Sequence, residues 1–151
     1  MNHKDKAVDL FYQGYNCSQA TLMAFSDLID HSEADMAKIA SSFGGGMGHM
    51  GEVCGALTGV FMAAGAIFGY NNPNNKQEKD EHYALIQEIA RRFKVQKGAI
   101  LCRDLLVKNK KSPHPTSRIP GKSCEHLVVC ASEILDDIIK EKSMKGLNNE
   151  K

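Results

Sequence analysis

The stretch Phe43–Gly59, FGGGMGHMGEVCGALTG, gathers glycines around one cysteine, Cys54. Its first half predicts a loop, because glycine adopts positive φ angles at no steric cost. Its second half opens an uncharged run, Val53–Gly69, with the sequence VCGALTGVFMAAGAIFG. A membrane span needs about 20 apolar residues, and this run is shorter and rich in glycine. The stretch therefore favours a buried central helix over a membrane span.

The segments around this run have helical periodicity and show no convincing alternation of period two. Asn16 and Ser32 are predicted N-caps, and Gly14 and Gly98 are predicted to end or interrupt helices. The predicted helical segments are His3–Tyr12, Cys17–His31, Ser32–Ser42, Gln77–Gln96, Ala99–Val107 and Cys124–Lys142. Residues 108–122 contain three prolines and predict a loop. We expect an all-α, single-domain bundle of five to six helices around the central glycine-rich helix, spanning residues 1–142, with a polar, frayed tail at 143–151.

Composition places the chain among ordinary globular proteins. It has 151 residues, 42% hydrophobic and 25% charged, which fits one domain. A net charge of +1 argues against nucleic-acid binding. The charged start, MNHKDKAVDLFYQG, lacks the apolar core of a signal peptide, so we expect a cytoplasmic protein. No sequence feature supports association with a membrane surface or a transporter, and a homodimer is expected from base rates alone.

Five cysteines are the main chemical signal. In a reducing cytoplasm they are free, catalytic or metal-bound. Helical phase directs Cys17, Cys54, Cys102 and Cys124 toward one interior region and leaves Cys130 at a flank. A single free cysteine often packs simply as a small hydrophobe. Cys17, Cys54 and Cys124, however, lie just inside predicted helix N-termini, where backbone N–H groups and the helix dipole lower a thiol pKa.

The glycines have two interpretations. Gly51, Gly55 and Gly59 recur every four residues, a spacing that lets helices approach closely. The loop GGGMG can also expose backbone N–H groups that hold an anion, including the sulfides or thiolates of an iron–sulfur cluster. A flexible loop with tight helix packing explains the same residues without a ligand. The candidate cofactor-binding residues are Gly44, Gly45, Gly46, Gly48 and Gly55.

Five fragments of the chain, taken in order, resemble the C-GCAxxG-C-C family of redox-active proteins. They are GYNCSQA, FGGGMG, GEVCGALTG, LCRDLL and SCEHLV. The resemblance extends from about Ala7 to Leu135. It implies that the recurring cysteines of the family correspond to Cys17, Cys54, Cys102 and Cys124, and gives Cys130 no counterpart. CGALTG takes the place of the core motif only if Leu57 and Thr58 are its variable positions.

The family is similar in turn to the C-terminal module of split-Soret cytochromes, for which an iron–sulfur centre is proposed. The resemblance therefore implies cysteine-based redox chemistry and a possible cluster. The haem-binding part of those cytochromes is lacking, so no haem is implied.

The leading hypothesis is a redox or electron-transfer protein that binds an iron–sulfur cluster through four metal ligands, Cys17, Cys54, Cys102 and Cys124. The second hypothesis is a metal-free thiol–disulfide protein that uses Cys17 and Cys54 as its redox pair. A structural zinc module ranks lower because close CxxC pairs are absent. His49 or a neighbouring methionine can complete a metal shell, although such residues more often pack or face solvent. The sequence shows no signal for an enzyme with a small-molecule substrate and does not identify a redox partner.

Overall fold

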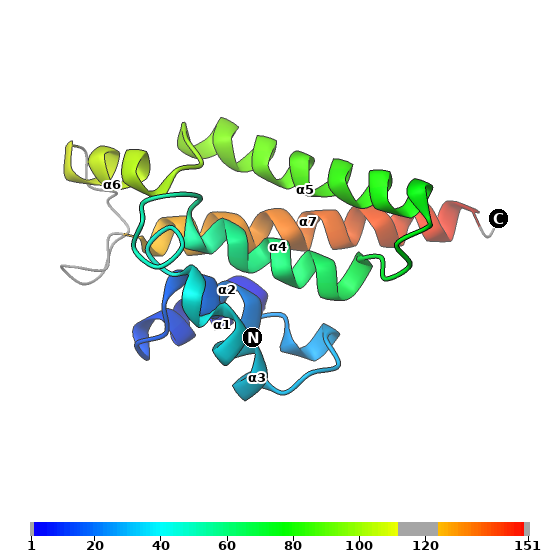
Figure 1. The fold of residues 1–151 in the computed structure, drawn as a ribbon, viewed down its shortest axis with the longest axis horizontal. Helices are drawn as coiled ribbons and strands as arrows, with labels where there is room; N and C mark the ends of the chain where they lie inside the picture. The colour runs from blue at the N-terminus through cyan, green and yellow to red at the C-terminus, as the bar shows by residue number, and fades with distance from the viewer. Residues whose placement is uncertain (1, 112–123, 150–151) are drawn as a thin grey trace.

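The computed structural model describes residues 2–111 and 124–149, which form seven α-helices (Figure 1). They are α1 (His3–Tyr12), α2 (Cys17–Met23), α3 (Glu33–Ala40), α4 (Gly55–Phe68), α5 (Lys76–Lys97), α6 (Cys102–Lys111) and α7 (Glu125–Asn149). Short 3₁₀ helices, Ser26–Leu28 and Ser41–Phe43, follow α2 and α3. These two ranges contain one isolated β-bridge and no β-strand. The predicted all-α class is therefore confirmed.

The predicted count of five to six helices is too low for the described residues. Gly98, where the sequence predicted an end or interruption, has a φ of 86°, a left-handed conformation that ends α5 and separates it from α6. The helix that begins at Cys17 ends at Met23 rather than His31, and the chain continues as a 3₁₀ turn.

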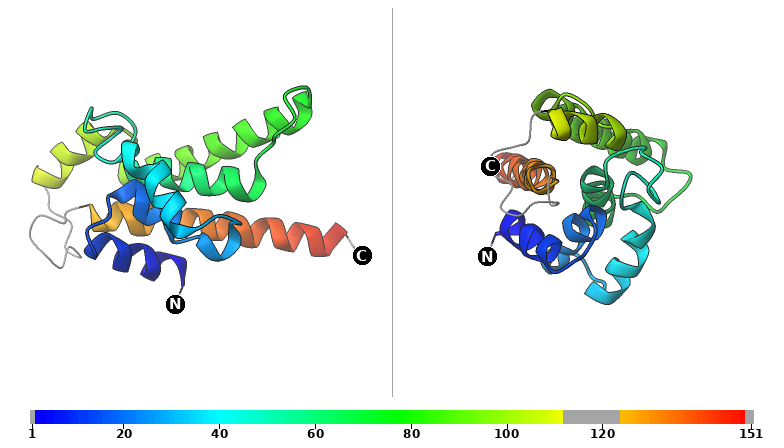
Figure 2. Two further views of the ribbon diagram at one scale, coloured as in Figure 1. Left: turned by 60° about the horizontal axis from the view of Figure 1, so that its bottom comes forward. Right: turned by 90° about the vertical axis from the view of Figure 1, so that its left-hand side faces the viewer.

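The helices form three groups. Figure 1 shows α5 and α6 on one side, α1, α2 and α3 on the opposite side, and α4 and α7 between them, and the end-on view in Figure 2 shows the same arrangement. α4 contacts α2, α5 and α7, while α1 packs along α7. The largest fully buried side chains of the core include Phe25, Leu57, Ile89 and Phe93. In the described part of the chain, no helix combines the length and apolar character that crossing a bilayer requires.

Side-chain caps explain several helix starts. Asn16 accepts a hydrogen bond from the Gln19 backbone N–H, and the Gln19 side chain accepts one from the Asn16 N–H, which makes a full capping box. The Ser32 hydroxyl accepts a hydrogen bond from the Asp35 N–H at 3.1 Å. Both predicted N-caps are confirmed.

Two predicted boundaries are wrong. α6 continues to Lys111, so residues 108–111 are helical although a loop was expected from residue 108. α7 ends at Asn149 rather than near Lys142, so the segment expected to fray is helical almost to its end. Just before this segment, Arg92 of α5 donates two hydrogen bonds to Glu141 of α7, at 3.0 and 2.9 Å. The remainder of the predicted proline-containing loop, residues 112–122, lies outside the described residues.

Close packing between α2 and α4 depends on two glycines. A Cβ atom on Gly55 would lie 2.7 Å from the Cys17 Sγ atom, and a Cβ atom on Gly59 would overlap the Thr21 hydroxyl. Thr21 Oγ1 donates a hydrogen bond to the Ala56 carbonyl at 3.0 Å, which joins the two helices directly. The four-residue glycine spacing thus brings α2 against α4, and with it Cys17 against the start of α4.

Candidate functional site

The glycine loop between the 3₁₀ helix ending at Phe43 and α4 is a series of turns. Its residues with left-handed φ angles are Gly45, Gly46, Met47, Gly48, His49 and Gly51. Met47 and His49, both at φ 63°, are not glycines, and this conformation is unfavourable for residues with a Cβ atom. Hydrogen bonds within the loop and packing against neighbouring elements therefore hold this conformation.

Much of the loop's hydrogen bonding is internal. The N–H groups of His49, Gly51 and Glu52 donate to the carbonyls of Gly44, Gly45 and Gly46, at 3.1, 3.2 and 2.9 Å respectively. These donors are consequently not directed at an anion, as an open N–H nest would require. The loop acts first as a rigid support for the residues around it.

The loop is joined to the connection between α5 and α6 by a short antiparallel pairing. Val53 and Leu101 form the isolated bridge. The Cys54 N–H donates to the Ile100 carbonyl at 2.8 Å, and the Cys102 N–H donates to the Glu52 carbonyl at 2.6 Å. Side chains alternate between the faces of such a ribbon, so Cys54 and Cys102 project from the same face. Backbone pairing thus brings together two cysteines from distant parts of the chain.

Two glycines make room for two thiols. A Cβ atom on Gly46 would lie 2.6 Å from the Cys102 Cβ atom, and one on Gly55 would press on the Cys17 Sγ atom as described above. Gly44 leaves space in the same way for the Asn16 side chain, the residue before Cys17. The glycines therefore fit the cysteine-bearing elements against the loop.

Electrostatic interactions connect four of the five free thiols. Burial raises the pKa of Cys54 far above its usual range, and the charges that Cys17 and Cys124 carry when ionised raise it further. The pKa of Cys102 is raised by burial and then by Cys17. Because the repulsion between two ionised thiols weakens with distance, Cys54 and Cys102 both lie near Cys17, and Cys124 lies near Cys54.

The expectation of a lowered pKa at Cys54 is wrong. Cys54 is the N-cap of α4, one residue before its first turn, and is 3% exposed. The N–H groups of Leu57 and Ala56 do lower its pKa, but burial outweighs them because a thiolate away from water loses its solvation. Cys124 likewise precedes α7, whereas Cys17 is the first residue of α2. Cys17 and Cys124 are only half-buried.

Cys130 has other surroundings. It is buried in α7, and its thiol donates a hydrogen bond to the Gln96 side-chain carbonyl at 3.4 Å. Burial raises its pKa to about 11, with smaller effects from Lys97 and Glu133. It is held by α5 rather than by the glycine loop.

The raised thiol pKa values predict a loss of stability in alkali. An unfolded thiol ionises near pH 8.5, whereas folded Cys54 stays protonated. Keeping the thiol protonated contributes fully to the free energy of unfolding below about pH 8.5. This contribution is lost as pH rises toward the pKa of the folded state, and the free energy of unfolding then falls by about 1.4 kcal/mol per pH unit for each such thiol. Urea unfolding of the reduced, metal-free protein between about pH 8 and 11 measures this slope. In Cys54→Ala the free energy of unfolding should fall less steeply with pH, by the contribution of one thiol. An unchanged slope would contradict the burial of the Cys54 thiol.

The side chains near the thiols are not arranged as metal ligands in this structure. In residues 2–111 and 124–149, no three histidine, cysteine or acidic side chains are arranged so that they could hold a metal ion. His49 is exposed and lies against Gly45, and Met50 is 68% exposed. Thiols are suitable ligands for a soft metal, and four of them lie near one another. To bind such a metal, the cysteine side chains would have to change orientation and lose their protons.

Sequence reasoning missed two buried polar contacts near the ends of the cysteine-bearing helices. Ser18 and Thr58, both buried between α2 and α4, have hydroxyl groups 3.3 Å apart. Glu125, which follows Cys124, is 4% exposed and accepts a hydrogen bond from the Tyr12 hydroxyl. Helical phase could have placed Ser18 and Thr58 on facing sides, but the Tyr12–Glu125 contact joins opposite ends of the chain and leaves no local signal.

Comparison with known proteins identifies the family of the chain. The family model that matches residues 15–138 has the description "Putative redox-active protein (C_GCAxxG_C_C)". An "Uncharacterized protein" of Archaeoglobus fulgidus is 26% identical over 110 residues, which cover 68% of this chain and 72% of the relative. No solved structure matches the chain. Because the family match begins before Cys17 and ends beyond Cys124, over most of the sequence, the chain belongs to the C_GCAxxG_C_C family of redox-active proteins.

Proposed function

We propose that the protein is a redox or electron-transfer protein whose centre consists of Cys17, Cys54, Cys102 and Cys124. The observation that carries this proposal is the packing of three of these cysteines: the Val53–Leu101 bridge places Cys54 and Cys102 on one face of the ribbon, and Gly55, next to Cys54, leaves room for the Cys17 Sγ atom. The effects of Cys17 and Cys124 on the pKa of Cys54, and of Cys17 on the pKa of Cys102, support it. Four free thiols near one another fit a reducing compartment, so the proposal includes a cytoplasmic location.

We infer further that these four cysteines hold an iron–sulfur cluster. Thiolates are the usual ligands of such clusters, and a bound cluster would supply one-electron transfer. A cationic metal favours the deprotonated thiol, which offsets the burial that now keeps Cys54 protonated. The residues of this chain would bind the ligand through sulfur, exclude water and orient backbone dipoles. Gly44, Gly45, Gly46, Gly48 and Gly55 are the proposed backbone neighbours.

Metal and sulfide analysis of protein purified without oxygen tests this proposal. The expected result is iron with acid-labile sulfide and visible absorbance typical of a cluster. Protein that stays free of iron and sulfide after anaerobic reconstitution would overturn it. Zinc bound without iron would instead support a structural zinc module.

A metal-free thiol–disulfide mechanism is the second candidate. The position of the Cys17 Sγ atom, 2.7 Å from where a Cβ atom of Gly55 would lie and thus beside Cys54, favours it. Half-buried Cys17 would attack the disulfide of a partner as a thiolate and release one partner thiolate. Cys54 would then lose its proton, attack the mixed disulfide at Cys17 and release the second partner thiolate. The sum is one new disulfide, Cys17–Cys54, and one partner disulfide reduced by two electrons.

Thiol trapping with mass spectrometry separates the two candidates. After mild oxidation of metal-free protein, the second mechanism requires a mass loss of two hydrogens and a linked peptide pair containing Cys17 and Cys54. Scrambled pairs that include Cys130 as often as Cys54 would contradict it.

A further inference from the structure

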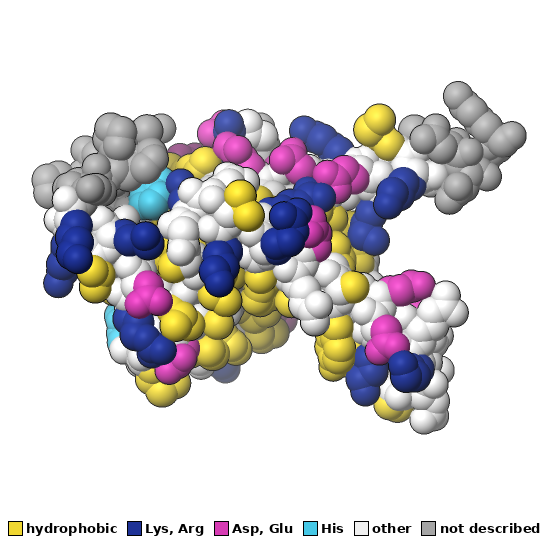
Figure 3. All heavy atoms as spheres, turned by 90° about the horizontal axis from the view of Figure 1, so that it is seen from above, with side chains coloured by type: hydrophobic (Ala, Val, Ile, Leu, Met, Phe, Trp, Pro, Cys, Tyr) yellow, Lys and Arg dark blue, Asp and Glu magenta, His cyan; other side chains and the backbone are white. Residues whose placement is uncertain are grey.

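A notch opens at the end of the bundle where the first turns of α5 and the C-terminal half of α7 diverge. Figure 3 shows it as a deep indentation between two projecting parts of the molecule, with charged side chains at its rim and hydrophobic ones within. It encloses about 270 Å³ and is lined mainly by Phe68, Tyr70, Glu78, Glu81, His82 and Lys142. None of these residues belongs to the cysteine centre.

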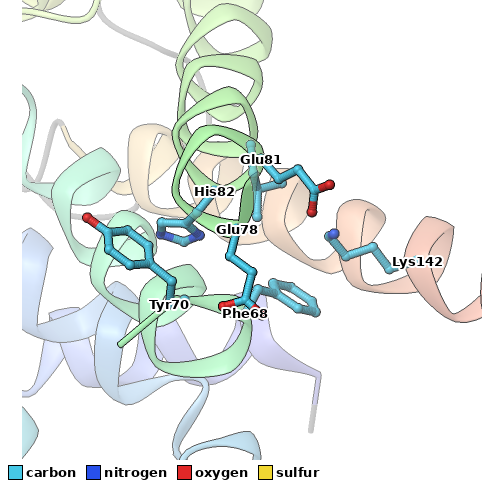
Figure 4. Close-up of a pocket in the computed structure, with 8 residues that line it drawn as sticks. Phe68, Tyr70, Glu78, Glu81, His82 and Lys142 are labelled. Carbon is cyan, nitrogen blue, oxygen red and sulfur yellow. The ribbon is translucent and has the colours of Figure 1, made fainter. Parts of the chain in front are cut away.

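Charges of both signs face the notch. Figure 4 shows Glu78 and Glu81 extending from α5, while Lys142 reaches in from α7. Within the described ranges, neither Glu78 nor Lys142 has an oppositely charged partner at ion-pair distance, and Glu81 accepts a hydrogen bond only from Gln77, at 3.1 Å. The notch therefore offers one ammonium group and two carboxylates whose charges are available to a ligand.

Aromatic rings form the walls between these charges. The Lys142 Nζ atom lies 4.9 Å from the centre of the Phe68 ring. The Tyr70 ring meets the His82 ring edge-on at 6.2 Å, and its hydroxyl lies 3.0 Å from the Tyr83 hydroxyl. Such walls suit a flat apolar group, because aromatic pairs at these distances attract one another.

His82 has an unused polar atom. Its Nδ1 atom is buried and makes no hydrogen bond to the described part of the chain. Burial, followed by the nearby Lys142 charge, lowers the pKa of His82, which favours the neutral imidazole near pH 7. Buried polar atoms are normally satisfied, so a small turn of this ring would give a bound molecule one more hydrogen-bonding group.

We propose that the notch binds a small zwitterion with an aromatic body, of the size of a free amino acid. Its ammonium group would face Glu78 and Glu81, its carboxylate would face Lys142, and its ring would pack on Phe68 and Tyr70. A simple anion would be repelled by the two carboxylates, and a simple cation would leave the Lys142 ammonium group without a partner. The cavity volume lies just below the range typical of sites for larger ligands.

Three matched probes test the charge requirement: L-phenylalanine, phenethylamine without the carboxylate, and 3-phenylpropionate without the ammonium group. NMR titration of labelled protein, followed at His82 and Tyr70, should show saturable binding that is tightest for L-phenylalanine. Absence of saturable binding of L-phenylalanine, or equal affinity for phenethylamine, would overturn the proposal.

A lysine substitution tests the assigned orientation. Lys142→Met should weaken L-phenylalanine binding about fivefold, as expected for one exposed ion pair, and should leave phenethylamine binding unchanged or tighter. Lys94→Met, which removes an exposed lysine elsewhere on α5, is the matched control and should leave all three affinities unchanged. Equal effects of the two variants would also overturn the proposal. Melting curves of both variants verify that they are folded.

Discussion

Gly59→Ala is expected to destabilise the protein by about 3 kcal/mol, the upper part of the range for overpacking a core. The added Cβ atom would overlap the Thr21 hydroxyl and lie 2.5 Å from the Ser18 carbonyl oxygen. Neither neighbour can move freely, because Thr21 is bonded to the Ala56 carbonyl and the Ser18 carbonyl is helix backbone. Urea unfolding at neutral pH measures the loss.

Gly65→Ala is the matched control in the same helix. A Cβ atom at Gly65 would meet only the His82 Nε2 atom, at 3.9 Å, which is an ordinary contact. Because alanine favours helix over glycine by about 1 kcal/mol, this variant should be as stable as the parent or more so. Similar losses in both variants would show that α2 and α4 are not in close contact at Gly59.

Cys54→Ser is expected to abolish the redox centre. Cys54 is the most deeply buried of the four proposed ligands, and it interacts with both Cys17 and Cys124. Serine keeps the size of the side chain but has no thiolate to ligate iron or to form a disulfide. Iron and sulfide content after reconstitution, and the disulfide formed on oxidation of metal-free protein, should both fall to background.

Cys130→Ser is the control for that substitution. It also removes a buried thiol, but one that contacts Gln96 on α5, and serine can keep donating a hydrogen bond there. We expect normal cofactor content and a change in unfolding free energy within about 1 kcal/mol. Equal losses of redox chemistry in the two variants would mean that the four cysteines have been assigned incorrectly.

Much of the fold is predictable from local signals. Asn16 and Ser32 cap helices as their sequence positions predict, and Gly98 ends α5 in the left-handed conformation that glycine permits. These features depend on a few consecutive residues, so the sequence contains their whole cause. The extension of α7 to Asn149 was not predictable in this way, because its last residues include Gly146, Asn148 and Asn149, which have low helix propensity.

The candidate site is predictable only in part. Helical phase directs Cys17 inward, and the glycine spacing indicates the close approach of α2 and α4 that places it over Gly55. The position of Cys102 against Gly46 depends on pairing between Val53 and Leu101, which lie 48 residues apart (101 − 53) and show no strand pattern. The raised pKa of Cys54 was missed because burial of a single side chain depends on the complete packing.

The short pairing of Val53 with Leu101 also determines how the two cysteines beside it become accessible. The backbone amides of Cys54 and Cys102 are both donors in this ribbon. A local opening that separates its two sides would release both amides together, so their hydrogen–deuterium exchange rates should change in parallel. Entry of oxygen or of a reductant to both sulfur atoms would then be governed by one opening equilibrium.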